Sequence, residues 1–293
     1  MATSISGAAL LDWRRAMLAL GGAASSLDWL LDLAGGVDWQ QQQQLRLRTD
    51  ALVPLRRNLS ELEALWRRHL EHQDPLQYLV GICPWRDLAL QVAPGVLIPR
   101  QETELLIELA IELTGPDSAG RSLRWADLGT GSGCLALALA QRWPQAQGFA
   151  VDCSEEALLQ AKGNLSSALE QGRLELRAGH WWEPLQDQWG GLDLVVSNPP
   201  YIPTAIWEGL EPVVREHEPE LALNGGSDGL DAIRTITKGA IQALAPGGWL
   251  LLEHHHDQSQ AVLALMEAGG LTELSARHDL EGVARFACAR RPR

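Results

Sequence analysis

The sequence predicts an α/β fold, with a doubly wound, mostly parallel sheet of seven strands behind a small N-terminal helical domain. From residue 123 onward, short apolar runs alternate with segments of helical periodicity, which indicates strands alternating with helices. A glycine-rich turn at 129–133 follows the first apolar run, and Asn-Pro-Pro-Tyr at 198–201 follows the run 192–197. Both lie at the carboxyl ends of predicted strands, where open α/β sheets bind their ligands.

Composition and charge limit the possible functions of this chain. Its 293 residues are 46% apolar and 21% charged, which is typical of a soluble globular protein with more than one domain. The net charge of −13 argues against a protein whose main task is to bind phosphate backbones. The charge is uneven, because residues 1–98 carry −1 and the remaining chain carries −12. This difference suggests two domains with different tasks.

Cysteine spacing and hydropathy bear on the cellular compartment. The four cysteines form no C-x-x-C pair, so their spacing fits neither a zinc site nor a disulfide framework and indicates a reducing compartment. No apolar run approaches the length of a membrane span. The N-terminus lacks the charged and apolar regions of a signal peptide. We therefore expect a cytoplasmic protein.

The front of the chain has the periodicity of a helical domain, which we expect to span residues 1–73. The predicted helices are 4–20, 26–34 and one that opens at Ser60. Glycine pairs end the first two helices. Ser60 and Glu63 have the spacing of a capping box at the start of the third. The five glutamines at 40–44 are expected to form a solvated helix or loop.

Residues 74–98 are rich in proline and glycine around short β-like runs, so we expect a β-hairpin that links two domains. A sheet domain should then occupy residues 99–293, beginning with a helix at 102–113. The predicted strands are 123–128, 148–151, 174–177, 192–197, 249–253, 271–276 and 283–289. The helices between them are predicted at 133–142, 154–169, 228–244 and 259–268.

The glycine-rich turn has the features of a small-molecule site. Glycines permit a tight turn and a close approach of the ligand to the backbone, and the helix that follows offers free N–H groups. Asp152 ends the second predicted strand, where doubly wound folds place a carboxylate that accepts from ribose hydroxyls. The turn reads Gly-x-Gly-x-Gly, which departs from the dinucleotide fingerprint and argues against a nicotinamide oxidoreductase.

Asn198-Pro199-Pro200-Tyr201 has the chemistry to hold a planar amino group. Asn198 carries an amide that both donates and accepts, the proline carbonyls only accept, and Tyr201 offers a flat face. Together they can bind both hydrogens of an –NH2 group. A proline-rich turn without a ligand is the alternative for this stretch considered alone.

His254-His255-His256 could suggest a metal site. Adjacent residues at a strand end point to opposite sides, which suits chelation poorly. We therefore expect a loop after the strand and no metal.

Taken together, the glycine turn, Asp152 and Asn-Pro-Pro-Tyr resemble a class I S-adenosylmethionine-dependent methyltransferase that acts on a planar amino or amide nitrogen. Four further stretches resemble signatures of the HemK/PrmC family: Pro75–Gly81, Leu97–Glu104, Glu218–Leu223 and Leu250–His254. That family methylates the glutamine side-chain amide in the Gly-Gly-Gln tripeptide of class-1 peptide chain release factors, which act in translation termination. The resemblance covers roughly residues 75–290, and the helical segment before them is only loosely similar.

The resemblance implies a role for individual residues. It places Gly129, Thr130, Gly131, Ser132 and Gly133 around the methionine part of the cofactor, Asp152 on the ribose, Trp181 beside the adenine and Asn198 at the junction with substrate. It assigns catalysis to Asn198, Pro199 and Tyr201, substrate binding to the same residues with Pro200, and the border of the active site to Arg100 and Glu104. The family often has Asp-Trp where this chain has His180-Trp181, so Trp182 remains an alternative to Trp181.

Two other functions share some of these features. An amino-methyltransferase acting on adenine or cytosine of a nucleic acid can carry Asn-Pro-Pro-Tyr, but the acidic balance and the lack of a basic recognition domain argue against it. A non-catalytic binding module for the translation machinery is opposed by the intact set of motifs. We therefore expect a monomeric enzyme with a release factor as its protein substrate, docked by the helical domain. We expect no membrane association and no direct binding to nucleic acid.

Overall fold

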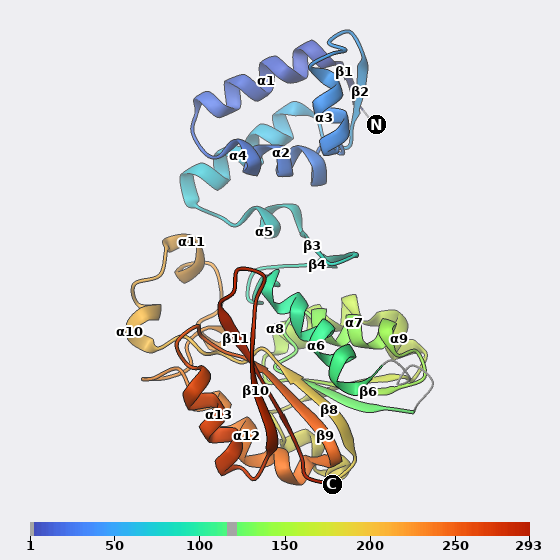
Figure 1. Cartoon of the computed structure of the whole chain (residues 1–293). Coiled ribbons are helices and arrows are strands. Elements are labelled where there is room, and N and C mark those ends of the chain that lie inside the picture. The colour runs from blue at the N-terminus through green and yellow to red at the C-terminus, as the bar shows by residue number, and fades with distance from the viewer. Residues whose placement is uncertain (1–2, 116–121) are drawn as a thin grey trace. The chain divides into compact units, whose positions relative to one another are not determined.

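The computed structural model describes residues 3–115 and 122–293, and the chain divides into two compact units. Met1–Ile82 and Pro212–His217 form the first, which we call the helical unit. Cys83–Glu211 and Glu218–Arg293 form the second, which we call the sheet unit. Figure 1 shows the course of the chain through both. No feature of the sequence indicates that residues 212–217 belong to the helical unit.

Short helices and one pair of strands around an apolar core make up the helical unit. Its elements are β1 (Thr3–Ser6), α1 (Gly7–Ala19), α2 (Ala24–Leu33), α3 (Trp39–Leu45), β2 (Leu52–Leu55), α4 (Leu59–His72), α5 (Leu76–Val80) and α11 (Pro212–Arg215). Leu27 and Leu30 of α2 pack with Leu62 and Trp66 of α4, and all four side chains are fully buried. The Trp66 indole N–H donates to the Met17 carbonyl at 3.1 Å, so this buried polar atom is satisfied.

Three features of the helical unit differ from the prediction. β1 and β2 pair antiparallel, which the helical periodicity did not indicate. The capping box of α4 is formed by Asn58 and Glu61, not by Ser60 and Glu63. Both pairs have the same spacing, and the helix starts at Leu59, one residue before Ser60. The glutamine run does form a helix, but Gln42 is buried in it and donates to the carbonyls of Asp28 and Val37.

A seven-stranded sheet forms the centre of the sheet unit, in the order β10-β11-β9-β8-β5-β6-β7. The strands are β5 (Arg124–Leu128), β6 (Gln147–Asp152), β7 (Leu174–Ala178), β8 (Leu192–Ser197), β9 (Leu244–Glu253), β10 (Thr272–His278) and β11 (Ala284–Arg290). Strands β5 to β9 are parallel to one another, and β11 runs antiparallel to both β9 and β10. The predicted doubly wound α/β class is therefore confirmed.

Helices cover both faces of this sheet (Figure 1). One face packs against α6 (Leu105–Thr114), α7 (Cys134–Arg142), α8 (Glu155–Asn164) and α9 (Ser166–Glu170), and the other against α12 (Asp231–Ala243) and α13 (Ser259–Ala268). Alternate strand residues serve the two faces, so Trp125 packs in the first core and Ala126 in the second. Because both faces are buried, the strands read as continuous apolar runs.

Shorter elements complete the sheet unit. They are the antiparallel pair β3 (Ile82–Trp85) and β4 (Leu88–Gln91), the short helices η1 (Glu102–Glu104), η3 (Glu183–Gln188) and η4 (Glu220–Ala222), and α10 (Thr204–Trp207). The helix predicted at 154–169 is broken at Leu165, and β9 starts at Leu244 instead of Trp249. A shift in the β8–β9 pairing accommodates the turn-forming residues at the start of β9. In residues 3–115 and 122–293, no helix is long and apolar enough to span a membrane.

Candidate active site

Three parallel strands of the sheet unit end at one cavity. The turn 129–133 follows β5, Asp152 is the last residue of β6, and Asn198 follows β8. Since β6 and β8 lie on either side of β5, this is the point at which the strand order reverses and ligands bind in open sheets. The cavity has a volume of about 210 Å³.

Most of the predicted site residues meet at this cavity. Nine line it: Arg100, Gly129, Thr130, Gly131, Ser132, Asp152, Trp181, Asn198 and Pro200. Gly133 instead precedes α7 as its N-cap, and Pro199 does not line the cavity. Tyr201 lines a small neighbouring cavity together with Arg100 and Asn198.

Glu104 lies apart from this group. Its carboxylate accepts from the Arg86 backbone N–H at 2.9 Å and lines a different cavity. Successive side chains of the one-turn helix η1 point in different directions, so Thr103 reaches the site and Glu104 does not. The stretch 99–104 therefore contributes Pro99, Arg100 and Thr103 to the cavity.

Backbone geometry explains the glycines of the turn. Gly129, Gly131 and Gly133 have φ angles of 71°, 56° and 83°, in the left-handed region that favours glycine. The N–H groups of Gly129 and Thr130 both donate to the Val151 carbonyl at 2.9 Å, which fixes the turn to β6. A Cβ at Gly131 would meet no atom within 4 Å, so this part of the turn is open to a ligand.

Two carboxylates hold the turn in place. Asp152 accepts from the Gly131 N–H at 2.8 Å with one oxygen and from the Ser154 N–H at 3.0 Å with the other. Each oxygen keeps a further lone pair for a ligand hydroxyl. Asp127 is fully buried and accepts from the Thr130 hydroxyl at 2.7 Å. Burial raises the pKa of Asp127 to about 7, which the bond from Thr130 partly opposes.

The two tryptophans at 181 and 182 have different surroundings. Trp181 lines the cavity, and its ring would lie 3.4 Å from a Cβ placed on Gly129. Its φ angle of 47° is unusual for a large side chain and indicates a constrained position. Trp182 is buried in the core, and its indole N–H donates to the Ile236 carbonyl at 3.1 Å. Of the two alternatives, Trp181 is therefore the one that faces the cavity.

Arg100 joins two segments at the edge of the cavity. Its guanidinium donates to Glu218 at 2.6 Å, and the other carboxylate oxygen of Glu218 accepts from the Ile98 N–H at 3.2 Å. Glu218 is buried, so this ion pair is shielded from water on one side. The pair holds the segment that carries Arg100 against the one that carries Pro219 and Leu221, two further lining residues.

A buried chain of hydrogen bonds starts at Asn198. The Asn198 amide N–H donates to the Thr103 hydroxyl at 3.0 Å, and that hydroxyl donates to Glu253 at 2.7 Å. The Tyr201 hydroxyl donates to the second oxygen of Glu253 at 2.9 Å. Burial raises the pKa of Tyr201, and the charge of Glu253 raises it further. The sequence did not single out Thr103 or Glu253, although a lone acid at the end of an apolar strand is a usable signal.

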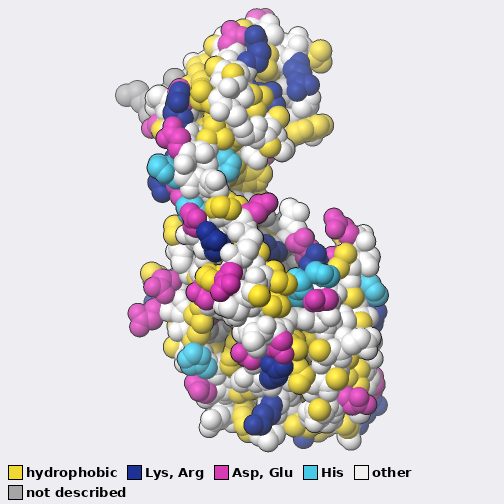
Figure 2. All heavy atoms as spheres, turned by 90° about the vertical axis from the view of Figure 1, so that its left-hand side faces the viewer, with side chains coloured by type: hydrophobic (Ala, Val, Ile, Leu, Met, Phe, Trp, Pro, Cys, Tyr) yellow, Lys and Arg dark blue, Asp and Glu magenta, His cyan; other side chains and the backbone are white. Residues whose placement is uncertain are grey.

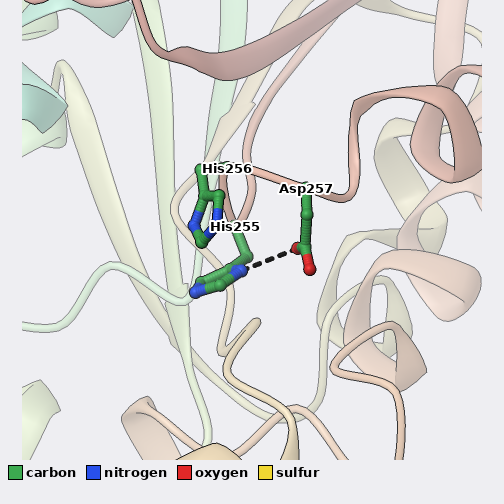
Figure 3. Close-up of side chains that lie close together, drawn as sticks. All are labelled: His255, His256 and Asp257. Atoms are coloured by element: carbon green, nitrogen blue, oxygen red, sulfur yellow. Dashed lines mark hydrogen bonds and ion pairs between the residues drawn. The ribbon is translucent and has the colours of Figure 1, made fainter.

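The histidines after β9 do not point apart as predicted (Figure 3). The rings of His255 and His256 have centroids 4.1 Å apart, and His255 Nδ1 lies 2.7 Å from an Asp257 oxygen. Strand alternation does not apply here, because β9 ends at Glu253 and a turn follows. His254 is buried, and its burial lowers its pKa.

Comparisons with known proteins agree with this geometry. Residues 103–206 match the family model described as the methyltransferase small domain. The chain is 50% identical to the release factor glutamine methyltransferase of Prochlorococcus marinus, over 97% of this chain and 96% of that one. It is 38% identical to the protein of the same name from Synechocystis, over 98% and 97% of the two chains.

One solved structure shows the same fold. The human METTL16 N-terminal domain, solved in complex with SAH, is 14% identical with a TM-score of 0.51, covering 89% of this chain and 90% of that one. The release-factor-specific protein-(glutamine-N5) methyltransferase of Alicyclobacillus acidocaldarius is 28% identical with a TM-score of 0.41, covering 70% and 100%.

Proposed function

This chain belongs to the family of release factor glutamine methyltransferases, and we propose that it methylates the glutamine of the Gly-Gly-Gln motif in class-1 peptide chain release factors. The reaction transfers a methyl group from S-adenosylmethionine to the side-chain amide nitrogen. The observation that carries the proposal is the position of Asn198, at the end of β8 and in one cavity with the glycine turn and Asp152.

The residues around the cavity fit S-adenosylmethionine, which supplies an electrophilic sulfonium methyl group. The turn 129–133 would hold the methionine part, where Gly131 leaves open space beside the backbone. Asp152 would accept from the ribose hydroxyls, since both of its oxygens have free lone pairs. Trp181 would lie against the adenine, because its ring already faces the cavity.

The target nitrogen sets the chemical task of the remaining residues. An amide nitrogen is a poor nucleophile because its lone pair is delocalised into the carbonyl. The protein must therefore mainly position the amide and stabilise the positive charge that develops on the nitrogen. In our proposal the Asn198 side-chain oxygen accepts one amide hydrogen. The backbone carbonyl of Pro199, which stands between the lining residues Asn198 and Pro200, accepts the other. The proton can leave after transfer, so no dedicated base is needed.

The helical domain, residues 1–73, serves in this proposal to dock the release factor. A tripeptide in the cavity offers few contacts, so a second surface is needed to orient a folded substrate. Two of its surface arginines are engaged in ion pairs, Arg67 with Glu63 and Arg68 with Asp74. The face in Figure 2 mixes acidic and basic side chains, which is unlike a nucleic-acid-binding surface.

The test is transfer of a labelled methyl group to a purified release factor, followed by mass mapping of the product. We expect one methyl group on the motif glutamine. A release factor in which that glutamine is replaced by alanine is the matched control and should stay unlabelled. Label in added DNA or RNA, with none in the release factor, would overturn the proposal in favour of a nucleic-acid amino-methyltransferase.

A further inference from the structure

We propose that Thr103 and Glu253 are positioning residues that fix the orientation of the Asn198 side-chain amide, so that its oxygen faces the target glutamine. This inference rests on the proposed function for the identity of the target. It concerns two residues whose described side-chain hydrogen bonds go to each other, to Asn198 and to Tyr201, and it follows from the direction of these bonds.

The three side chains come from separate elements and meet at the cavity, which Thr103 and Asn198 line. Thr103 belongs to η1, Asn198 follows β8, and Glu253 ends β9. Thr103 and Glu253 are 2% and 1% exposed, so water does not compete for their polar atoms. The Asn198 nitrogen lies 3.0 Å from the Thr103 hydroxyl, which lies 2.7 Å from Glu253. Each polar group in this chain therefore depends on its neighbour.

The number of available protons fixes the donor and the acceptor in each of these hydrogen bonds. A threonine hydroxyl has one hydrogen, and an ionised carboxylate has none. When Glu253 is ionised, the Thr103 hydrogen must therefore go to Glu253, and the Thr103 oxygen can only accept from Asn198. Only the NH2 end of the Asn198 amide can satisfy it. A flipped amide would place its oxygen against the Thr103 lone pairs and turn its NH2 group toward the glutamine NH2, where donor would meet donor.

Tyr201 closes the network from the other side. Its hydroxyl occupies the second oxygen of Glu253, so one carboxylate anchors both ends of the segment 198–201. The titratable and charged groups around Glu253 are Glu102 on η1, Cys134 on α7, Tyr201 in the segment 198–201, and Arg285 on β11. Burial raises the pKa of Glu253 to about 7, and its hydrogen bonds and Arg285 oppose this rise. Above that pH the carboxylate is the acceptor that the network requires.

Thr103→Val tests the proposal, because valine has the shape of threonine without the hydroxyl. We expect at least a tenfold lower kcat for release factor methylation, while the Kd for S-adenosylhomocysteine stays within twofold. Thr103→Ser restores the hydroxyl and should return kcat to within threefold of wild type. Thr237→Val is the matched control, since Thr237 is a buried threonine whose hydroxyl bonds within α12, and its kcat should be unchanged.

A second variant changes the acceptor. In Glu253→Gln the side chain has one acceptor and one donor, so it cannot accept from both Thr103 and Tyr201. If its NH2 group faces Thr103, the hydroxyl is left to donate to Asn198 and favours the flipped amide. We expect at least a tenfold loss of kcat. The double variant with Thr103→Val should be no slower than the slower single variant, because both act through Asn198.

An assay without catalysis separates this inference from the proposed function. In 15N-labelled protein without cofactor, the Asn198 side-chain NH2 signals should show an NOE to the Thr103 methyl group and slow hydrogen exchange. Both features should be lost in Thr103→Val and kept in Thr237→Val. An Asn198 NH2 group that exchanges equally fast in wild type and Thr103→Val would overturn the positioning role, even if the release factor is methylated. Slow exchange in wild type and fast exchange in Thr103→Val would support the positioning role, even if the methylated substrate proved to be another protein.

Discussion

The helical unit and the sheet unit differ in where they bury polar groups. Among residues 3–115 and 122–293, Gln42 is the one buried polar side chain of the helical unit, whereas the sheet unit buries several ionisable groups, among them Asp127, Glu218 and Glu253. Burying such groups costs free energy unless they are well paired. All three lie next to the cavity or hold a residue that lines it. The sheet unit thus buries ionisable groups that shape its site at a cost in stability, while the core of the helical unit mainly provides stability.

The largest expected effect tests the helical side of this comparison. Trp66→Ala removes the largest fully buried side chain of the apolar core and should lower the free energy of unfolding of the helical unit by about 3–5 kcal/mol. Native-state hydrogen exchange measures this loss. Leu47→Ala, at an 87% exposed position of the same unit, is the control and should have little effect. The comparison would break if Trp66→Ala also weakened cofactor binding to the sheet unit.

The next effect is catalytic. Asn198→Ala should lower the rate of methyl transfer at least a hundredfold, which corresponds to about 2.7 kcal/mol of transition-state stabilisation. The reason is the loss of the side-chain oxygen that accepts from the target amide. Steady-state kinetics on the release factor measure the rate, and an unchanged melting temperature confirms the fold. Near-normal turnover in the folded variant would contradict the mechanism.

A smaller effect concerns cofactor affinity. Asp152→Ala should raise the Kd for S-adenosylmethionine at least tenfold, or about 1.4 kcal/mol, because the ribose hydroxyls lose their acceptor. Calorimetry measures the Kd. Asp187→Ala, which removes an exposed acid on η3, is the control and should leave the affinity unchanged. An unchanged Kd in Asp152→Ala would remove this residue from the cofactor site.

The last prediction concerns the pH dependence of stability. The pKa of Glu253 is about 7 in the folded protein, above its ordinary value of 4.5, so the folded state holds this proton more tightly than the unfolded state does. Relative to Glu253→Gln, wild type should therefore gain stability as the pH falls from 8 toward 5, by at most about 1.4 kcal/mol per pH unit. Urea unfolding of both proteins across this range tests the sign. A difference that does not vary with pH would show that Glu253 titrates normally.

Sequence reasoning predicted the sheet unit better than the helical unit, for a physical reason. Strands buried on both faces leave continuous apolar runs, and β8 was predicted at its observed bounds. The pairing of β1 with β2 depends on residues some fifty positions apart, and four-residue strands carry little periodicity. Asn58 and Ser60 both begin a pair with the spacing of a capping box. The sequence does not tell which of the two starts the helix, and the structure shows that it is Asn58.

The same reasoning predicted residues that line the cavity and missed the residues that hold them in place. Gly131, Asp152 and Asn198 stand at strand ends, a position that sequence can reveal. Thr103 and Glu253 act through side-chain contacts between separate elements, and one sequence without contacts does not link them. The histidine turn shows the opposite error, because alternation was applied one residue past the end of β9.

Residues 212–217 give the helical unit an unusual folding order. His217 Nε2 lies 3.0 Å from the His72 carbonyl oxygen, and its Nδ1 lies 3.3 Å from an Asp74 carboxylate oxygen, inside a unit whose other residues end at Ile82. During synthesis, residues 1–82 leave the ribosome long before residue 217 does. We therefore expect the first-made part of the protein to be among the last completed, after β5 to β8 have emerged.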